Sequence, residues 1–282
     1  MNSIFRNSRV KLSQGMLFWR EIGEGTAIIF LHGAWSDSSQ WISVMEMLAQ
    51  DFHCFAPDLL GFGESEFPNV HYSIDLQVEC IAQLLYTLKR ALKQERVYLV
   101  GDSLGSWIAA SYALKYPEQI NGLVLLAPEG VEIEGQKERW QKMQRILKRP
   151  SLVFQLLRLF RPIAKIFGLN GKIEQDWRFH QVMLHYPTAC ELLFQRQHPE
   201  IQAELLHDQL CFITVPVLIL QGEKDNQEAI AMSRAYAQYI LHAQLKIIPH
   251  GEDNLPESCT SVVAGDIRNF LKGKKNAVMY YS

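Results

Sequence analysis

The fold is decided by one stretch of sequence, residues 96–109, which reads RVYLVGDSLGSWIA. Residues 96–101 form an almost unbroken apolar run, which is typical of a strand buried on both faces of a sheet. The residues that follow 103 read as a helix that Pro117 ends. Gly101 and Gly105 stand two places either side of Ser103, and small residues there permit a strand-to-helix turn tight enough to strain the serine backbone. The stretch therefore predicts a strand, a sharp turn that lifts a serine hydroxyl above the sheet edge, and a helix.

The rest of the chain repeats this alternation of short apolar runs and longer helical patterns. Such a rhythm predicts an α/β fold, with a doubly wound and mostly parallel sheet between two layers of helices. Eight strands are expected, of which the first two form an antiparallel hairpin at the sheet edge. The expected strands are 10–13, 16–22, 27–32, 52–57, 96–101, 122–128, 216–222 and 244–249.

The alternation lapses between Pro128 and Pro216, where about 80 residues contain no convincing strand. This part reads as helices broken at prolines and glycines, so it is interpreted as a helical cap inserted after the sixth strand. The predicted domains are a core of residues 1–130 and 211–282 and a cap of residues 131–210.

The composition of the chain argues against several classes of protein. The chain has 282 residues, is 48% hydrophobic and carries a formal net charge of −2, which is typical of a globular protein and gives no overall basic field to favour nucleic acid as a partner. Its five cysteines are scattered without a C-x-x-C pair, which favours reduced thiols in a cytoplasmic protein over disulfides or a zinc site. No run is long and apolar enough to span a membrane, and the first residues lack the apolar centre of a secretory signal.

Three further landmarks occur in a fixed order around the serine motif. They read LHGAW at 31–35, DLLGFGES at 58–65 and QGEKD at 221–225. With GDSLG at 101–105, the chain resembles the α/β-hydrolase superfamily over nearly its whole length. The resemblance implies acyl transfer, with Ser103 as nucleophile, Asp225 as the triad acid and His250 as base, and with the backbone N–H groups of Ala34 and Leu104 as oxyanion donors. It implies no metal or cofactor.

The chemistry explains why such residues are needed together. A serine hydroxyl is a poor nucleophile at neutral pH until an imidazole takes its proton, and a carboxylate must orient that imidazole. Glu129 is an alternative acid, because it follows the next strand after the serine motif, where some members of the superfamily carry theirs.

The histidine is the weakest element of the pattern. In relatives it usually stands some 17 residues before an aromatic near the end of the last helix, and counting back from Phe270 leads to Asp253. His250 comes three residues earlier. Either the turn is rearranged so that His250 reaches Ser103, or an aspartate occupies the position of the base. A solvated carboxylate has a pKa near 4 and is a feeble base toward a serine hydroxyl.

Three other side chains are candidates for the substrate pocket. Trp35 and Trp107 could line an apolar cavity, although large aromatics more often belong to the core. Asp102 is unusual beside a nucleophile, where it would add negative potential or make a surface hydrogen bond.

The predicted cap is basic. Residues 135–172 contain ten lysines and arginines against one acid, Glu138, and residues 152–167 combine a wide apolar face with a narrow cationic one. A basic amphipathic segment suggests peripheral contact with an anionic membrane, or a lipophilic substrate with acidic groups. The alternative is that the cations are simply solvated.

The sequence as a whole predicts a serine hydrolase that cleaves a carboxylic ester of an apolar small molecule through Ser103, His250 and Asp225. The alternative is a catalytically impaired hydrolase fold that binds a hydrophobic ligand, a membrane or a protein partner, because Asp253 stands where the histidine is expected.

Overall fold

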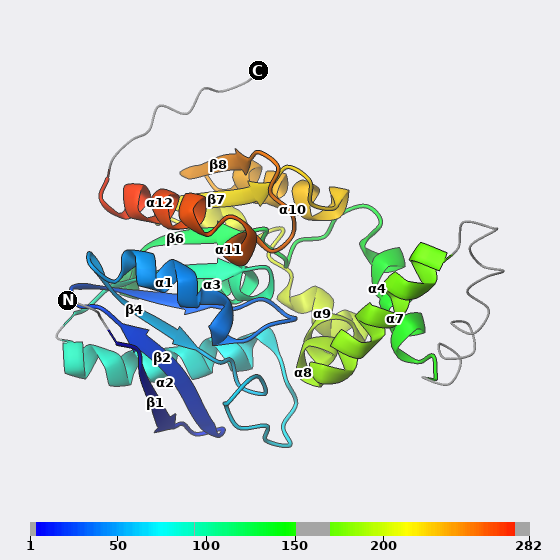
Figure 1. Ribbon diagram of the computed structural model, residues 1–282, viewed down its shortest axis with the longest axis horizontal. Helices are drawn as coiled ribbons and strands as arrows, with labels where there is room; N and C mark the ends of the chain where they lie inside the picture. The colour runs from blue at the N-terminus through cyan, green and yellow to red at the C-terminus, as the bar shows by residue number, and fades with distance from the viewer. Residues whose placement is uncertain (1–3, 93, 151–169, 274–282) are drawn as a thin grey trace. The chain divides into compact units, whose positions relative to one another are not determined.

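A computed structural model describes residues 4–92, 94–150 and 170–273 of the chain (Figure 1). Eight strands form one sheet in the order β1-β2-β4-β3-β5-β6-β7-β8, in which β1 and β2 are antiparallel to their neighbours and all other pairs are parallel. The predicted α/β class and mostly parallel eight-stranded sheet are confirmed. The strands are β1 (Arg6–Lys11), β2 (Met16–Ile22), β3 (Thr26–Leu31), β4 (Phe52–Pro57), β5 (Val97–Asp102), β6 (Ile120–Leu126), β7 (Val217–Gly222) and β8 (Ala243–Ile248).

Two expected elements differ from the structure. The first strand was expected at 10–13 but lies at Arg6–Lys11, with Arg6 opposite Glu21. It is an exposed edge strand of mainly polar residues, so it lacks the apolar run that identifies buried strands. The last helix, expected at 258–272, spans Thr260–Leu271, and a separate short helix at Leu255–Ser258 precedes it.

The helices begin and end where local chemistry dictates. Ser73 caps the N-terminus of α2, since the Leu76 N–H donates to its Oγ at 3.0 Å, and Pro117 follows the end of α3. The described helices are α1 (Ile42–Leu48), α2 (Ile74–Leu92), α3 (Leu104–Lys115), α4 (Gln136–Leu147), α7 (Asn170–His185), α8 (Pro187–Cys190), α9 (His198–Glu204), α10 (Gln227–Tyr239), α11 (Leu255–Ser258) and α12 (Thr260–Leu271). Shorter helical turns are η1 (Ser38–Trp41), η2 (Pro117–Gln119), η3 (Glu191–Gln195) and η4 (Leu210–Phe212).

The central strands of the sheet are buried on both faces. Alternate residues of the central strands, such as Phe30 in β3 and Val100 in β5, pack in one apolar core with α1, α11 and α12, and α1 and α12 lie side by side in Figure 1. The intervening residues, such as Leu99 and Leu123, are equally buried, because α3 packs on β3, β5 and β6 and α10 packs on β7 and β8. Burial on both faces explains why these strands read as continuous apolar runs.

The chain divides into two compact units, residues 1–133 with 204–282 and residues 134–203. The second unit is shorter at both ends than the predicted cap, 131–210. It contains α4, α7, α8 and η3, and in it Gln144 donates a hydrogen bond to the Phe194 carbonyl. The amphipathic segment predicted at 152–167 lies outside the described residues. None of the described helices has the length and apolar content that crossing a membrane requires.

The chain leaves and re-enters the first unit at one point. The Leu206 N–H donates to the Gly130 carbonyl at 2.8 Å, and the Trp107 indole N–H donates to the Glu204 carbonyl at 3.1 Å. Gly130 has a φ of +93°, and a Cβ there would lie 2.4 Å from the Trp107 ring. The two ends of the insertion are thus closed against each other by bonds that belong to the first unit.

A glycine contact positions α3 against the sheet. A Cβ on Gly105 would lie 2.2 Å from the Leu31 carbonyl oxygen and 2.7 Å from that of His32. These atoms belong to the backbone at the end of β3, which cannot move aside as a side chain could. The first turn of α3 therefore lies at a distance from β3 that only glycine permits.

We predict that Gly105→Ala lowers the free energy of unfolding by about 3 kcal/mol or more, because the added methyl group must displace backbone. Gly265→Ala is the matched control. Gly265 lies inside α12 with no atom within 4 Å of a Cβ, so this change should stabilise the helix by up to about 1 kcal/mol. Urea unfolding measures both, and equal effects of the two substitutions would contradict the packing argument.

Candidate active site

Ser103 occupies the sharp turn between β5 and α3. Its backbone has φ +48° and ψ −109°, a conformation that non-glycine residues adopt only where the surrounding structure forces it. The Ser103 N–H donates to the Leu126 carbonyl at 2.8 Å and its carbonyl accepts from the Glu129 N–H at 3.4 Å. A Cβ on Gly101 would lie 2.5 Å from backbone atoms of Gly105, so small residues are required on both sides. The strained serine turn expected from the motif is present.

The two predicted oxyanion donors flank this turn. Leu104 is the first residue of α3, so its N–H precedes the first hydrogen bond of the helix and remains available. Ala34 follows the end of β3, which the first turn of α3 contacts through Gly105. Both residues are buried. Within the described part of the chain, neither amide donates to another group.

His32 fixes the loop that carries Ala34. The Leu59 N–H donates to its Nε2 at 3.0 Å, so Nδ1 bears the proton and donates to the Gly33 carbonyl at 2.8 Å. Burial lowers the pKa of His32 below its ordinary value of 6.5, which keeps the ring neutral. Because the C=O and N–H of one planar trans peptide point in opposite directions, this bond also directs the Ala34 N–H away from His32.

The segment 58–65 serves the same scaffold. Asp58 accepts from the backbone N–H groups of Ser38 and Glu64, each at 2.7 Å. Ser65 donates to the Asp58 carbonyl at 2.7 Å and accepts from the Phe18 N–H at 2.9 Å. The segment 58–65 therefore connects η1, β2 and the turn after β4, and its Asp58 and Ser65 side chains make structural hydrogen bonds.

Both candidate acids lie at the same edge of the sheet, after neighbouring strands. Asp225 is 8% exposed and accepts hydrogen bonds from the Gln221 side chain and from the backbone and side chain of Asn226. Glu129 is 6% exposed, and its backbone is held by the Ser103 carbonyl and by the Tyr236 hydroxyl. The assignment of Asp225 or Glu129 as the triad acid stays a prediction.

The structure does not bring His250 to Ser103. The His250 side chain is 81% exposed, and its Nδ1 lies 3.8 Å from Glu223 Oε2. Its backbone, at φ +60°, donates to the same carboxylate at 2.9 Å. Among the described residues, no hydrogen bond joins His250 to Ser103 or Asp225, and Asp253 is exposed in the loop that follows β8. In this structure the His250 imidazole therefore faces Glu223, and its role as the base for Ser103 stays a prediction.

Asp102 is neither a surface residue nor an open pocket residue. It is 6% exposed, and its Oδ2 accepts from the Gln40 amide at 2.8 Å. The pKa of Asp102 is raised to about 7, mainly by burial; the carboxylates of Asp225, Asp253 and Glu257 also raise it, and the Gln40 hydrogen bond opposes these effects. The sequence motif drew attention to Asp102, but no pattern in the sequence identifies Gln40.

The tryptophans expected in the pocket differ in placement. Trp107 is 1% exposed and packs against Gly130, so it is a core residue, whereas Trp35 is half-buried. In the described ranges, no group of three or more histidine, cysteine or acidic side chains is arranged to hold a metal ion.

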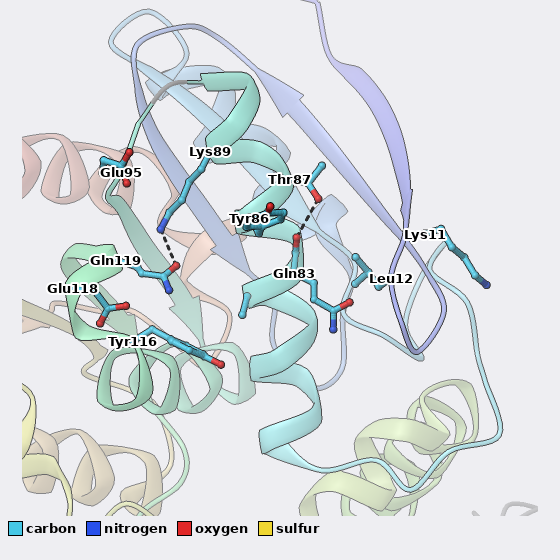
Figure 2. A pocket seen from close by; sticks show the side chains of 11 residues that line it. Lys11, Leu12, Gln83, Tyr86, Thr87, Lys89, Glu95, Tyr116, Glu118 and Gln119 are labelled. Carbon is cyan, nitrogen blue, oxygen red and sulfur yellow. Dashed lines mark hydrogen bonds between the residues drawn. The ribbon is translucent and has the colours of Figure 1, made fainter.

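A separate surface pocket of about 640 Å³ lies beside α2 (Figure 2). Gln83, Tyr86 and Lys89 of α2 line it together with Lys11 and Glu118. Lys89 donates to the Gln119 side chain at 2.7 Å. None of the residues predicted for catalysis lines this pocket, so it does not mark the active site.

Comparison with known proteins agrees with this fold and turn. A model of the alpha/beta hydrolase fold family matches residues 26–258, which include every landmark described above. The chain belongs to the alpha/beta hydrolase fold family, as the sequence motifs predict.

Individual proteins match this chain at low identity or over only part of its length. Human monoacylglycerol lipase ABHD6 is 25% identical over 239 residues, covering 80% of this chain and 69% of that protein. The 2-hydroxy-6-oxo-2,4-heptadienoate hydrolase of Pseudomonas putida is 32% identical over 121 residues, covering 40% of this chain and 41% of that protein. Uncharacterised mycobacterial proteins reach 38% identity, but the match covers only 32% of their length. A thermophilic esterase from Thermogutta terrifontis shares the fold with a TM-score of 0.71 at 21% identity, covering 95% of this chain and 98% of that one.

The raised pKa of Asp102 predicts a pH-dependent stability. Between about pH 4 and pH 7 the folded protein keeps a proton on Asp102 that the unfolded chain has lost, so the free energy of unfolding falls as the pH rises through this range. Asp102→Asn keeps a hydrogen-bond acceptor for Gln40 and cannot ionise. We therefore expect Asp102→Asn to gain up to about 2.7 kcal/mol of stability over the wild type between pH 5 and pH 8, which corresponds to the two pH units between 5 and the Asp102 pKa of about 7.

Urea unfolding at the two pH values measures this difference. Asp208→Asn, at an exposed position, is the control and should show no comparable change. A constant difference between Asp102→Asn and wild type at pH 5 and pH 8 would show that Asp102 ionises as freely in the fold as in water.

Proposed function

We propose that this protein is a serine hydrolase that cleaves a carboxylic ester of an apolar substrate, with Ser103 as the nucleophile. The observation that carries the proposal is the Ser103 backbone at φ +48°. A strained residue of this kind costs about 1–3 kcal/mol and persists mainly where function requires it. The backbone N–H groups of Ala34 and Leu104 would hold the oxyanion that forms when the Ser103 Oγ attacks the ester carbonyl.

In this mechanism His250 takes the Ser103 proton and later delivers it to the leaving alcohol, while Asp225 orients the imidazole. His250 must first leave Glu223, with which it makes an exposed contact at 3.8 Å. Exposed ion pairs contribute little stability, so the contact offers little resistance to that movement.

The relatives support this class of reaction. They include a monoacylglycerol lipase, a dienoate hydrolase and an esterase. A lipase and an esterase act on carboxylic esters, and the dienoate hydrolase widens the range of substrates that this fold accommodates. An apolar ester is therefore the substrate class that we assign to Ser103.

A second candidate is a catalytically impaired member of the family that binds a hydrophobic ligand or a partner. The exposed position of His250 and the aspartate at 253 favour it. Without an imidazole within reach, the Ser103 hydroxyl lacks the proton acceptor that acyl transfer needs.

Covalent labelling with a fluorophosphonate distinguishes the two candidates. We expect the wild type to be labelled at Ser103 and to hydrolyse p-nitrophenyl esters, and Ser103→Ala to lose both. His250→Ala should reduce the labelling rate by at least about a hundredfold, since general-base assistance contributes 10²–10⁴-fold. Mass spectrometry of the labelled peptide identifies the modified residue.

His242→Ala is the control for the histidine, because His242 is an exposed residue between α10 and β8 and should label like the wild type. An unreactive Ser103 in the wild type would remove the hydrolase proposal in favour of the binder. Rapid labelling that survives His250→Ala would retain Ser103 and exclude His250 as the base.

We further propose peripheral contact with an anionic membrane through residues 135–172. Support comes from α4, whose Trp140, Met143 and Ile146 are buried within the second unit. Its opposite side exposes four cations, Lys137, Lys142, Arg145 and Lys148. In the described residues none of the four forms an ion pair with a carboxylate. Each cation near an anionic surface contributes about 1 kcal/mol.

Vesicle sedimentation tests this contact. The protein should bind vesicles of phosphatidylcholine with phosphatidylserine and not vesicles of phosphatidylcholine alone. Lys142→Glu with Arg145→Glu should weaken binding by roughly thirtyfold or more, which corresponds to the loss of about 2 kcal/mol. Arg90→Glu with Arg96→Glu changes the net charge equally at exposed positions outside the second unit and should leave binding intact. Equal binding to both vesicle types would refute the proposal.

A further inference from the structure

One buried amide connects the two loops that carry the oxyanion donors. Gln40, in η1, is 4% exposed. Its Oε1 accepts from the Gly33 N–H at 3.0 Å, and its Nε2 donates to Asp102 Oδ2 at 2.8 Å. Gly33 precedes Ala34, and Asp102 precedes the Ser103–Leu104 turn. The Gln40 side chain thus spans from one half of the oxyanion site to the other.

Only one orientation of the Gln40 side-chain amide satisfies both of its hydrogen bonds. The Gly33 N–H can only donate, so it requires the oxygen of Gln40, and the Gln40 NH₂ group then faces Asp102, where a carboxyl oxygen accepts. A hydrophobic side chain at either position would leave a buried donor without a partner, which is costly in a protein interior. Gln40 and Asp102 are therefore chemically matched.

Gly33 is held on both sides. Gln40 accepts from its N–H, and His32 donates to its carbonyl at 2.8 Å. Because the Gly33 carbonyl shares a planar peptide with the Ala34 N–H, fixing Gly33 fixes the direction of the Ala34 donor. Asp102 Oδ2 also lies 2.6 Å from the position of a Gly33 Cβ, so the carboxyl group packs directly on this glycine.

The charged groups that act on the pKa of Asp102 are three carboxylates. Asp225 follows β7, Asp253 lies in the loop after β8, and Glu257 lies in α11, and each raises the Asp102 pKa. Asp102 Oδ1 has no hydrogen-bond partner among the described residues. Among the described residues the carboxyl group has its side-chain hydrogen bond from Gln40, so Gln40 is the contact that orders it.

We propose that Gln40 and Asp102 form a positioning bridge that sets the Ala34 donor against the Ser103–Leu104 turn. The inference rests on the proposed hydrolase function, because it assigns the bridge to the oxyanion site of that reaction. Neither residue touches the reacting atoms. Both act by holding the two backbone donors at a fixed separation, which transition-state stabilisation by preorganised dipoles requires.

Three variants test the bridge. Gln40→Met and Asp102→Leu remove it with side chains of similar size, while Asp102→Asn restores an acceptor for the Gln40 NH₂. We expect the two apolar variants to lower kcat for a p-nitrophenyl ester and the rate of Ser103 labelling about ten- to hundredfold, with KM nearly constant, since misplacement by about 1 Å costs this much. Asp102→Asn should recover most of the loss.

Gln94→Met is the matched control. Gln94 makes the same kind of two-ended bridge at the opposite end of β3, where it accepts from the Ala27 N–H at 3.0 Å and donates to the Gly25 carbonyl at 2.7 Å. Its loss should reduce stability and leave kcat within about threefold of the wild type. If Gln94→Met lowered kcat as much as Gln40→Met does, the loss of kcat would reflect lower stability of the fold and not positioning, and the proposal would be overturned.

Hydrogen exchange of the Gly33 amide, followed by NMR with ¹⁵N-glycine, gives a readout that needs no activity. Exchange should accelerate in Gln40→Met and in Asp102→Leu and return toward the wild-type rate in Asp102→Asn. Unchanged exchange in Asp102→Leu would overturn the bridge. If the wild type shows no Ser103 labelling, the hydrolase proposal fails while this comparison still decides whether Asp102 orders Gly33 through Gln40.

Discussion

The structure depends on how closely the first turn of α3 approaches the ends of β3 and β5. Backbone atoms there meet at distances that exclude even a methyl group, at Gly105 against Leu31 and at Gly101 against Gly105. This contact forces Ser103 into its unusual backbone conformation, and it places the end of β3, with Ala34 beyond it, next to the first amides of α3. Strain at one residue is thus maintained by the packing of three elements.

Around this contact, polar side chains build a frame from the backbone outward. His32, Asp58 and Ser65 connect β2, η1 and the turn after β4, and Gln40 extends the frame to Asp102. These groups are buried, and each makes hydrogen bonds to backbone or to another side chain, as buried polar groups must. The landmarks that identify the family in the sequence are in large part the residues that hold its loops.

The sequence predicts those parts of the molecule that leave a regular pattern of apolar or small residues. Strands buried on both faces give continuous apolar runs, which places β4 to the residue and β3, β5 and β7 within one. The serine turn was found because only small residues allow it. The exposed edge strand β1 carries no such pattern, and its bounds were missed. The positions of Gln40 and His250 depend on loop conformation, which leaves no repeating signal, so neither the buried bridge nor the contact of His250 with Glu223 could be predicted.

The hydrogen bond between Leu206 and Gly130 closes the junction of the two units, so the segment inserted there can vary in length and composition. Because bonds within the first unit already hold these two ends together, the residues between them contribute little to that closure, and the entropy of a loop grows only with the logarithm of its length. Segments of different length and composition can therefore be exchanged at this neck while the sheet and the serine turn stay intact. The junction makes the second unit an insertion that can be replaced without altering the sheet or the serine turn.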